Sequence, residues 1–450
     1  MIGNIETTIM QPTDLSARLD RHPVIKARMI RLLDLVDNVA GDLQRADDAE
    51  QRAIDELRDL GQEVLSGWAE KQASQMATRL EESHNVVRQV KKKVHWYSTF
   101  GTIEVTEQTY LNKDDGKLQR PFSNSADIQC RAYSVPLQRV VTDFGADVPF
   151  ASVPTKLLEH YGITLPKGAA AIITEHHANQ LSKEDDIGAA VTGGTTDILI
   201  AELDGSMIPI VETGDPEDAT VDKRKKRKTQ WQEAKLSLVR SSEDADPIFA
   251  VTLGDTKAAG DDIKRLALAA GFGPTTQVHA LGDGAPWIAA QVEQQFGDQG
   301  NYLIDFYHLC EYLGDAAPVC GQGQSDDWLK KQKERFKNGE MQVVVAELEA
   351  SLEPETVPDL QAPVRRCHRY ITNRPKQFNY KAALDAKLPI GSGEVESAHR
   401  YVIQKRLKLP GAWWLPKNAQ AMLNLRTLRA NHRWDGYWKR ITQCLPSLAA

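Results

Sequence analysis

The sequence predicts an α/β fold in which a domain of alternating strands and helices is interrupted by an α-helical insertion. A helical N-terminal region with a small β unit precedes this domain. Three observations support the prediction. Apolar residues recur at three- and four-residue spacing between Val24 and Lys93, strand-length apolar runs alternate with helical patterns between residues 197 and 306, and the charged stretch 323–386 has no strand signals.

The N-terminal region, residues 1–93, is predicted to form two or three amphipathic helices. Apolar residues that share one helical face include Ile54, Leu57, Leu60, Val64 and Trp68. The Glu, Arg and Gln side chains on the other face form either a coiled-coil-like dimer surface or a solvated face. The region is therefore a candidate for dimerisation.

A small β unit is predicted at residues 94–125, where β-branched and aromatic residues surround Gly101 as in a hairpin. Residues 126–192 return to a helical pattern. A short helix from Val153, a turn at Tyr161–Ile163 and a second helix from near Pro166 predict a helix-turn-helix-like unit. This unit either binds DNA or packs as an ordinary helical hairpin.

The α/β domain is predicted to begin at the boundary Gly193–Thr196, and its first part covers residues 193–322. Strand-like runs are expected at 197–203, 207–212, 231–239 and 248–253, followed by a helix from about Asp261, a strand at 277–281, a helix from Pro286 and a strand at 302–306. Early strands followed by helix, strand, helix and strand are the element order of an RNase H-like domain. The insertion covers 323–386, and the domain resumes at 387–450 with basic, tryptophan-rich helices.

Three acidic residues of this domain occupy positions from which they can converge. Asp204 follows the apolar run Ile198–Leu203, Asp283 follows Val278–Gly282, and Glu396 lies on a predicted basic helix. Two carboxylates that end separate strands and a third on a later helix can together hold two Mg²⁺ ions, or Mn²⁺ ions, beside a phosphodiester. The sequence therefore predicts a metal-dependent DNA-processing enzyme with these three acids as catalytic and metal-binding residues.

The two aspartates also have structural interpretations. Asp204 and Gly205 are typical of a tight turn between two strands. Asp283 could cap the helix that starts at Pro286. Each aspartate is a weak signal by itself, and the combination with Glu396 carries the prediction.

Two further groups of residues accompany the acids. Glu394 and Glu396 point to different sides of their helix, so only one can reach the metal ions. With Ser392 as a helix cap, Glu394 has an electrostatic role in the first turn and Glu396 is the better ligand. His308, which follows Asp305, either contacts the scissile phosphate as a further catalytic residue or satisfies a hydrogen bond near the site.

The charge distribution identifies a basic segment despite a formal charge of -7. Between Ser397 and Arg440, ten Lys or Arg residues accompany the single acid Asp435. Cations alternating with tryptophan suit a groove that follows a DNA backbone and stacks an unpaired base, although the tryptophans could equally pack the core. The candidate DNA-binding residues are Arg400, Lys405, Arg406, Lys408, Trp413, Trp414 and Lys417.

Composition excludes several other classes of protein. The five cysteines form no Cys-x-x-Cys pair, so neither a zinc ribbon nor a disulfide framework is expected. No segment resembles a signal peptide, and no apolar run approaches the roughly 20 residues that span a bilayer. We expect a cytoplasmic protein without a membrane partner.

Taken together, these motifs resemble the DDE transposases of bacterial insertion sequences, in particular the ISKra-type group, with a distant similarity to Mutator-like transposases. The resemblance covers most of the chain from about Ser134. It rests on Asp204–Met207 with Trp231–Lys235, on Gly282–Ile288, on Asp305–Leu313 and above all on Leu388–Trp414.

The resemblance implies a transposase that binds the terminal inverted repeats of its element, cleaves a phosphodiester with water and joins the freed 3′ hydroxyl to target DNA. It assigns the two aspartates to Asp204 and Asp283 and the glutamate to Glu396, and it matches Asp305 and His308 to an acid-histidine pair of related families. It also implies a homo-oligomer that brings two ends together, associated with the nucleoid in a bacterial cytoplasm.

Two alternative functions remain open. The first is a non-catalytic, transposon-derived DNA-binding regulator, which the intact carboxylates disfavour. The second is a metal-dependent phosphohydrolase that acts on small phosphate esters through Gly282–Ala285. The basic segment disfavours this second alternative, because a small substrate has no use for it.

Overall fold

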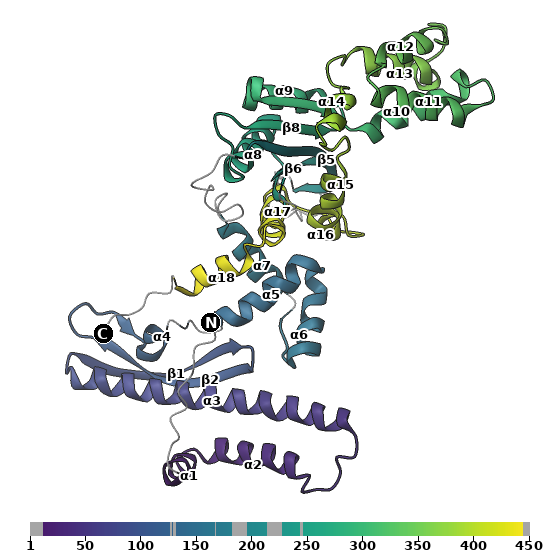
Figure 1. Ribbon diagram of the computed structural model, residues 1–450. Helices are drawn as coiled ribbons and strands as arrows, with labels where there is room; N and C mark the ends of the chain where they lie inside the picture. The colour runs from purple at the N-terminus through teal and green to yellow at the C-terminus, as the bar shows by residue number, and fades with distance from the viewer. Residues whose placement is uncertain are drawn as a thin grey trace. The chain divides into compact units, whose positions relative to one another are not determined.

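The computed structural model describes residues 12–126, 128, 132–166, 168–181, 196–213, 227–243 and 246–443. The chain divides into two compact units, each with its own sheet (Figure 1). The first comprises Met1–Gly145, Phe150–Ile173 and Trp438–Ala450, and the second Ala146–Pro149 and Thr174–Tyr437. The predicted boundary Gly193–Thr196 lies, except for Thr196, outside the described residues.

The first unit combines helices with a four-stranded sheet of order β3-β2-β1-β4. A long helix lies along the β1–β2 hairpin, and Ala69, Val94, Ile103 and Phe122 are buried between them (Figure 1). The helices are α1 (Pro12–Asp20), α2 (Pro23–Asp37), α3 (Ala46–Glu82), α4 (Pro121–Ser125), α5 (Val135–Asp147) and α6 (Val153–Tyr161), with the 3-10 turn η1 (Phe150–Ser152). The strands are β1 (Val86–Ser98), β2 (Gly101–Asn112), β3 (Leu118–Gln119) and β4 (Ala132–Tyr133).

The hairpin around Gly101 confirms the prediction, since Ser98 pairs with Gly101 and the glycine has φ +106°. The extent of the preceding helical region differs from the prediction. It ends at Glu82, and β1 already begins at Val86 rather than at residue 94. Residues 86–93 are rich in valine, which favours strands, and their backbone pairs with β2 as far as Asn112.

The predicted sequence of helix, glycine turn and helix is found after Val153. Helix α6 ends at Gly162, which has φ +67° and donates its N–H to the carbonyl of Leu158. The next helix, α7 (Ala169–Gln180), begins slightly later than the predicted start near Pro166. Contact of this segment with DNA stays a prediction.

The second unit is built on a mixed five-stranded sheet of order β7-β6-β5-β8-β9. Strand β6 is antiparallel to both of its neighbours, whereas β5, β8 and β9 are parallel. The strands and intervening helices are β5 (Ile198–Thr213), β6 (Arg227–Ser241), β7 (Ile248–Thr252), α8 (Thr256–Ala269), β8 (Gln277–Gly282), α9 (Pro286–Phe296), η3 (Gly297–Gln299) and β9 (Gly300–Ile304). The predicted order of early strands, helix, strand, helix and strand is therefore confirmed.

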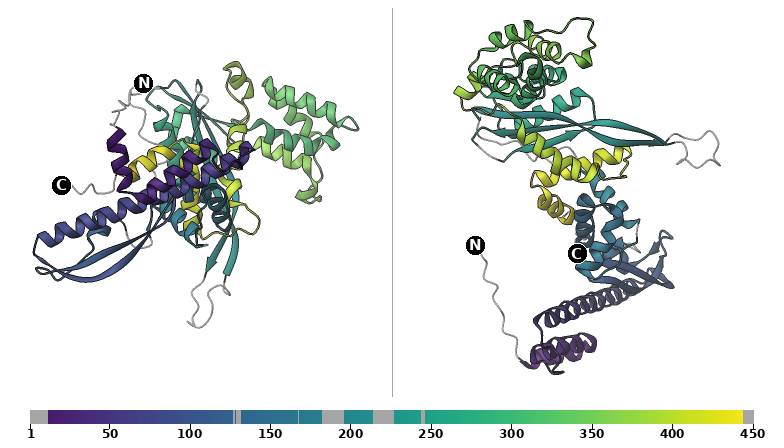
Figure 2. Two further views of the ribbon diagram at one scale, coloured as in Figure 1. Left: turned by 90° about the horizontal axis from the view of Figure 1, so that it is seen from below. Right: turned by 90° about the vertical axis from the view of Figure 1, so that its right-hand side faces the viewer.

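Strands β5 and β6 form a long hairpin whose pairing runs without interruption from Leu199 to Thr213 of β5 (Figure 2). The two strands predicted at 197–203 and 207–212 are thus a single strand. Asp204 lies in its middle, neither in a tight turn nor at a strand end. Gly205 serves packing rather than a turn, because a Cβ there would lie 2.1 Å from the Oε1 atom of Glu233 on β6.

Helices cover both faces of this sheet (Figure 1). Successive side chains of β5 point to opposite faces, so Leu203 and Asp204 belong to different layers. On the Leu203 side lie α8 and α9, and Ile288 of α9 approaches Gly282 of β8. On the Asp204 side lie two later helices, α15 (Gly393–Ala398) and α17 (Pro416–Ala430).

The remaining elements include the predicted insertion, which is helical as expected. Aromatic side chains of this region, including Phe336, Phe378 and Tyr380, belong to the same buried cluster as Leu203. The insertion therefore shares a core with the sheet. The elements are α10 (Phe306–Cys320), α11 (Ser325–Lys337), α12 (Met341–Glu349), η4 (Asp359–Gln361), α13 (Pro363–Thr372), α14 (Tyr380–Asp385), the π-helical turn η5 (His399–Gln404), α16 (Lys405–Leu407) and α18 (Trp434–Gln443).

Within the described ranges, no helix combines the length and the apolar character that crossing a membrane requires. Cys310, Cys320 and Cys367 are free thiols, and Cys130 and Cys444 lie outside the described residues.

Acid is expected to destabilise the second unit through His177 of α7. The side chain is buried, and its Nδ1 atom lies 2.8 Å from the hydroxyl of Tyr437. Burial, together with the neighbouring His176, lowers the pKa of His177 from 6.5 to about 4. Between these values the unfolded chain binds a proton that the folded chain excludes, so the free energy of unfolding should fall by up to about 3 kcal/mol as the pH falls through this range. Chemical denaturation of the unsubstituted protein and of His177→Gln from pH 7 to about pH 4 measures this effect. An equal acid loss in both proteins would contradict it.

Candidate functional site

Asp204 lies on β5, and Asp283 directly follows the neighbouring parallel strand β8. In the β5–β8 ladder Glu202 pairs with Leu281, so the same register sets Asp204 beside Asp283 just after the end of β8. Both aspartates lie two residues beyond that pair, Asp204 within β5 and Asp283 in the turn that follows β8. The structure thus places the backbone of one predicted aspartate beside the turn that carries the other, and their joint role in a metal site stays a prediction.

The side chain of Asp283 stabilises its own turn. Its Oδ1 atom accepts a hydrogen bond of 2.8 Å from the N–H of Ala285. Ala285 is the residue that precedes α9, and no side chain caps this helix. Asp283 therefore lies in the turn before α9. The structural interpretation in which Asp283 caps this helix is wrong.

Three side chains hold the backbone of the Asp283 turn. The hydroxyl of Tyr302 accepts from the N–H of Gly284 at 3.0 Å, and the hydroxyl of Tyr370 donates to the carbonyl of Asp283 at 2.8 Å. Arg374 donates from Nε to the carbonyl of Gly284 at 3.0 Å. Tyr370 and Arg374 belong to the insertion, so the insertion fixes the turn that carries Asp283.

Positive and polar groups surround Asp204. The Nε2 atom of buried His399 lies 3.0 Å from Oδ2 of Asp204, but neither ring nitrogen has the geometry of a hydrogen bond. Burial would raise the pKa of Asp204, yet the contact with His399, the N–H of Gly205 and the charge of His308 together lower it below its ordinary value. Asp204 is therefore ionised at neutral pH.

Glu202 links the strand of Asp204 to helix α15. Its side chain is 1% exposed, and its carboxyl accepts a 2.8 Å hydrogen bond from the N–H of Val395. Burial raises the pKa of Glu202 to about 8, although the Val395 N–H opposes the shift. Since Glu202 and Asp204 share one face of β5, this contact sets α15 over the Asp204 side of the sheet.

The two glutamates of α15 have different surroundings. Glu394 lies in the first turn of α15 and forms a bidentate ion pair with Arg240 of β6, with distances of 2.7 to 3.0 Å, a partner that the sequence did not predict. The side chain of Glu396 is exposed. In the part of the chain that the structure describes, no three His, Cys, Asp or Glu side chains are grouped so as to hold a metal ion. The three predicted acids thus lie on β5, in the turn after β8 and on α15, which contacts β5.

Asp305 joins the start of α10 to the loop before α15. This fully buried carboxylate accepts from the N–H groups of Tyr307 and His308 and from both the N–H and the hydroxyl of Ser392. Ser392 precedes α15 but makes no capping bond with it, contrary to the prediction. Asp305 therefore positions both His308 and the segment that leads to Glu396.

His308 lies close enough to Asp204 for its charge to lower the pKa of that residue. Its Nδ1 atom is 3.6 Å from the carboxylate of Glu311, and its side chain is partly exposed. This placement leaves the imidazole accessible to a substrate near Asp204.

Two candidate DNA-binding residues lie in the core rather than on the surface. Arg406 is 3% exposed, and its guanidinium lies 4.8 Å from the ring centre of buried Trp414. Burial lowers the pKa of Arg406 to about 10. Trp414 donates from Nε1 to the carbonyl of Leu407. These two side chains stabilise the fold and present no surface to DNA.

The other DNA-binding candidates are accessible. Lys408 is partly buried, and the side chains of Arg400, Lys405, Trp413 and Lys417 are exposed. Trp413 packs beside Trp231 of β6, with ring centres 6.3 Å apart, and the two side chains are 45% and 58% exposed. Exposed tryptophans in contact form a ready surface for a planar ligand.

Sequence reasoning assigned no role to Glu202, Trp231 or His399. Glu202 is an acid inside the apolar run Ile198–Leu203, and a charge at such a position requires a buried partner. Trp231 stands among Thr, Gln and Glu residues, a polar context that indicates an exposed aromatic side chain. His399 follows Glu396 by three residues, and its closeness to Asp204 depends on the π-helical turn that it begins.

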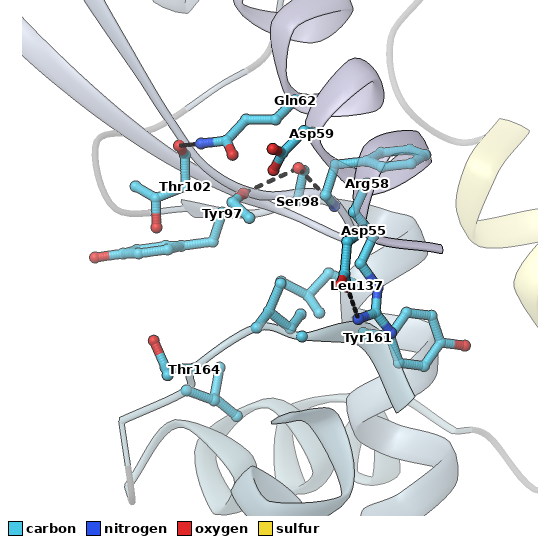
Figure 3. A pocket seen from close by; sticks show the side chains of 15 residues that line it. Asp55, Arg58, Asp59, Gln62, Tyr97, Ser98, Thr102, Leu137, Tyr161 and Thr164 are labelled. Atoms are coloured by element: carbon cyan, nitrogen blue, oxygen red, sulfur yellow. Dashed lines mark hydrogen bonds and ion pairs between the residues drawn. The ribbon is translucent and has the colours of Figure 1, made fainter. Parts of the chain in front are cut away.

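A cavity of about 500 Å³ lies in the first unit, between α3, the β1–β2 turn and the end of α6 (Figure 3). Two of its polar side chains hold neighbouring segments together. Arg58 donates to the carbonyl of His160 and pairs with Asp55, and Gln62 donates to the carbonyl of Thr102. These contacts connect α3 to α6 and to β2 within this unit. We assign no ligand to the cavity.

No protein-family model and no curated protein matches the sequence. Among solved structures, the chain is similar to the Drosophila P element transposase strand transfer complex, with a TM-score of 0.28 and 10% identity over 72% of this chain and 83% of that chain. A similarity this low carries no conclusion about fold or function, so the resemblance to insertion-sequence transposases rests on the sequence motifs.

Proposed function

We propose that the protein is a DDE transposase with an RNase H-like catalytic domain, which cleaves DNA at the ends of a mobile element and joins the freed strand to target DNA. One observation carries the proposal. Asp204 lies on β5, Asp283 follows the adjacent parallel strand β8 at the matching register, and α15, which bears Glu396, is hydrogen-bonded to β5 through Glu202. The order of strands and helices supports the RNase H-like assignment.

The donor set fits Mg²⁺, or Mn²⁺, because hard cations prefer carboxylate oxygens. Asp204 is anionic at neutral pH and, with Asp283, would bind the ions, while Glu396 would complete the site after a change of side-chain conformation. When bound, two such ions activate the attacking oxygen and stabilise the leaving oxygen of a phosphodiester.

The neighbouring cations would hold the DNA strand at these carboxylates. Lys408 lies near Asp204: burial lowers the pKa of the lysine and the charge of Asp204 raises it. Lys408 and His308 would donate to the scissile phosphate. His399 would keep Asp204 oriented toward the ions.

Recognition of the element ends would use other parts of the chain. The helix-turn-helix-like segment and the N-terminal helices would bind the terminal inverted repeats, and Arg400, Lys405 and Lys417 would follow the backbone. Association of two copies, which synapsis of two ends requires, would use α2. This helix has no buried side chain and exposes Ile30, Leu33 and Val36.

Metal removal tests the proposal directly. A labelled duplex that carries the DNA bordering the gene is expected to be cut in Mg²⁺ or Mn²⁺, to remain intact in EDTA and to be cut again after Mg²⁺ is restored. Gel analysis of labelled strands measures the products. Binding without cutting under every metal condition would instead indicate the non-catalytic regulator.

The tryptophan pair predicts a preference for unpaired bases. Trp231→Ala and Trp413→Ala are each expected to weaken binding of single-stranded DNA about tenfold, because stacking of a base on an aromatic ring contributes about 1 to 3 kcal/mol. Fluorescence anisotropy with a labelled oligonucleotide measures the change. Leu360→Ala, which removes a highly exposed apolar side chain of the same unit, is the control and should bind normally. Unchanged affinity in both tryptophan variants would assign the pair a purely structural role.

A further inference from the structure

A second cavity, of about 270 Å³, lies in the insertion beside the Asp283 turn. It is formed by α10, by α13 and by the residues that follow α13. No carboxylate lines it, whereas three guanidinium groups do. The lining residues are Tyr312, Arg366, Arg369, Tyr370, Asn373 and Arg374.

The floor of the cavity is aromatic. The rings of Tyr312 and Tyr370 are stacked, with centres 3.9 Å apart and planes 12° apart, and the guanidinium of Arg374 lies 4.6 Å from the centre of Tyr370. Stacking of this kind restricts the side chains before a ligand arrives. Arginine side chains that are already held in one orientation can bind planar or tetrahedral anions with several donors at once.

Two of these arginines, Arg366 and Arg369, form ion pairs with exposed carboxylates near the cavity. Arg369 pairs with Asp359 at 2.7 Å, and both side chains are about half exposed. Arg366 pairs at 3.1 Å with Asp315, which is largely exposed, and its Nε atom is buried without a hydrogen-bond partner. Exposed ion pairs contribute little to stability, so a phosphate can replace these carboxylates.

The cavity is coupled to the site through two of its own residues. Tyr370 and Arg374 line it and also donate to the carbonyls of Asp283 and Gly284. A ligand in the cavity therefore lies next to the turn that carries Asp283.

We propose that this cavity binds a backbone phosphate of the DNA substrate, an inference that rests on the function proposed above. The arginines would donate to the phosphate oxygens, and the exposed part of the tyrosine pair would contact the adjoining sugar or base. The insertion thereby acts as a second DNA-binding surface, in addition to the basic segment after Glu396.

The test measures binding of a fluorescein-labelled duplex of arbitrary sequence to the full-length protein, in EDTA and over a range of salt concentrations. Arg369→Gln is expected to weaken binding about tenfold and to lower the slope of log Kd against log salt by about one, as loss of one phosphate contact does. Arg369→Lys retains the charge and should recover most of the affinity. Lys330→Gln removes an exposed cation from α11 outside the cavity and should leave the slope unchanged.

The outcomes separate this inference from the proposed function. If the unsubstituted protein binds the duplex and Arg369→Gln binds it with the same affinity and slope, the inference is wrong and the proposed function stands. The inference is also wrong if a free nucleotide shifts the melting temperature through Arg369 while DNA binding is unaffected, because the cavity is then a nucleotide site. If the unsubstituted protein binds no DNA at all, the proposed function and the inference both fail. Arg369 is half exposed and its substitution should not disturb folding, which a thermal melt of each variant checks.

Discussion

Replacement of Asp204 or Asp283 by asparagine is expected to lower Mg²⁺-dependent cleavage by at least about a thousandfold, since each change removes an anionic metal ligand from chemistry to which bound ions contribute several kcal/mol. DNA binding should change little, because neither aspartate would be a DNA-backbone ligand. The two measurements are cleavage of the labelled duplex in Mg²⁺ and its binding in EDTA. Asparagine preserves the size of each side chain and retains an oxygen that can accept the Ala285 N–H at position 283.

Asp261→Asn provides the matched control. Asp261 lies on α8, on the opposite face of the sheet from Asp204, and its side chain is exposed. Loss of this charge should leave cleavage within about twofold, as is usual for surface positions. Full activity of Asp283→Asn would remove the catalytic assignment, whatever the behaviour of Asp204→Asn.

Gly284→Ala is expected to have the largest effect on stability among the residues that surround the site. Gly284 has φ +89°, and a Cβ at this position would lie 2.6 Å from the hydroxyl of Tyr370. The left-handed backbone and the clash together should lower the free energy of unfolding by about 2 to 4 kcal/mol. Cleavage should fall as well, because the carbonyls that Tyr370 and Arg374 bind would have to move. Urea denaturation and the cleavage assay measure these two effects.

Gly314→Ala distinguishes this effect from a general intolerance of alanine at glycine positions. Gly314 lies inside α10, and apart from its chain neighbours and the adjacent helix backbone no atom would lie within 4 Å of a Cβ at this position. Alanine should therefore stabilise the protein slightly, by about 0.5 to 1 kcal/mol. A Gly284→Ala protein as stable as the unsubstituted protein would mean that the turn is looser than its hydrogen bonds indicate.

Local patterns in the sequence were sufficient to predict the element order of the second unit. Apolar runs of strand length, the proline that starts α9 and the helical pattern of the insertion are short-range signals, and each corresponds to an observed element. The same signals failed at Asp204. An Asp-Gly pair is typical of a turn, but unbroken pairing with β6 extends the strand through it, and this long-range pairing has no local signature.

The roles of some residues could not be predicted from the sequence, because these roles depend on which side chains the tertiary structure buries. Arg406 and Lys408 are two positions apart in the same basic segment, yet one packs on Trp414 and the other lies near Asp204. Sequence composition treats them alike, because only the tertiary structure decides which cation is covered. The approach of His399 to Asp204 likewise depends on where Glu202 anchors α15.

The hydrogen bonds from Tyr370 and Arg374 to the Asp283 turn have a consequence for engineering. An insertion that interrupts a domain is often treated as a detachable module that can be trimmed to obtain a minimal enzyme. Deleting this one would leave the carbonyls of Asp283 and Gly284 without two of their donors and would open the aromatic core beneath them. A shortened version of this protein would therefore have to retain α13 with its C-terminal extension, together with the aromatic side chains of α11 and α14 that complete this core.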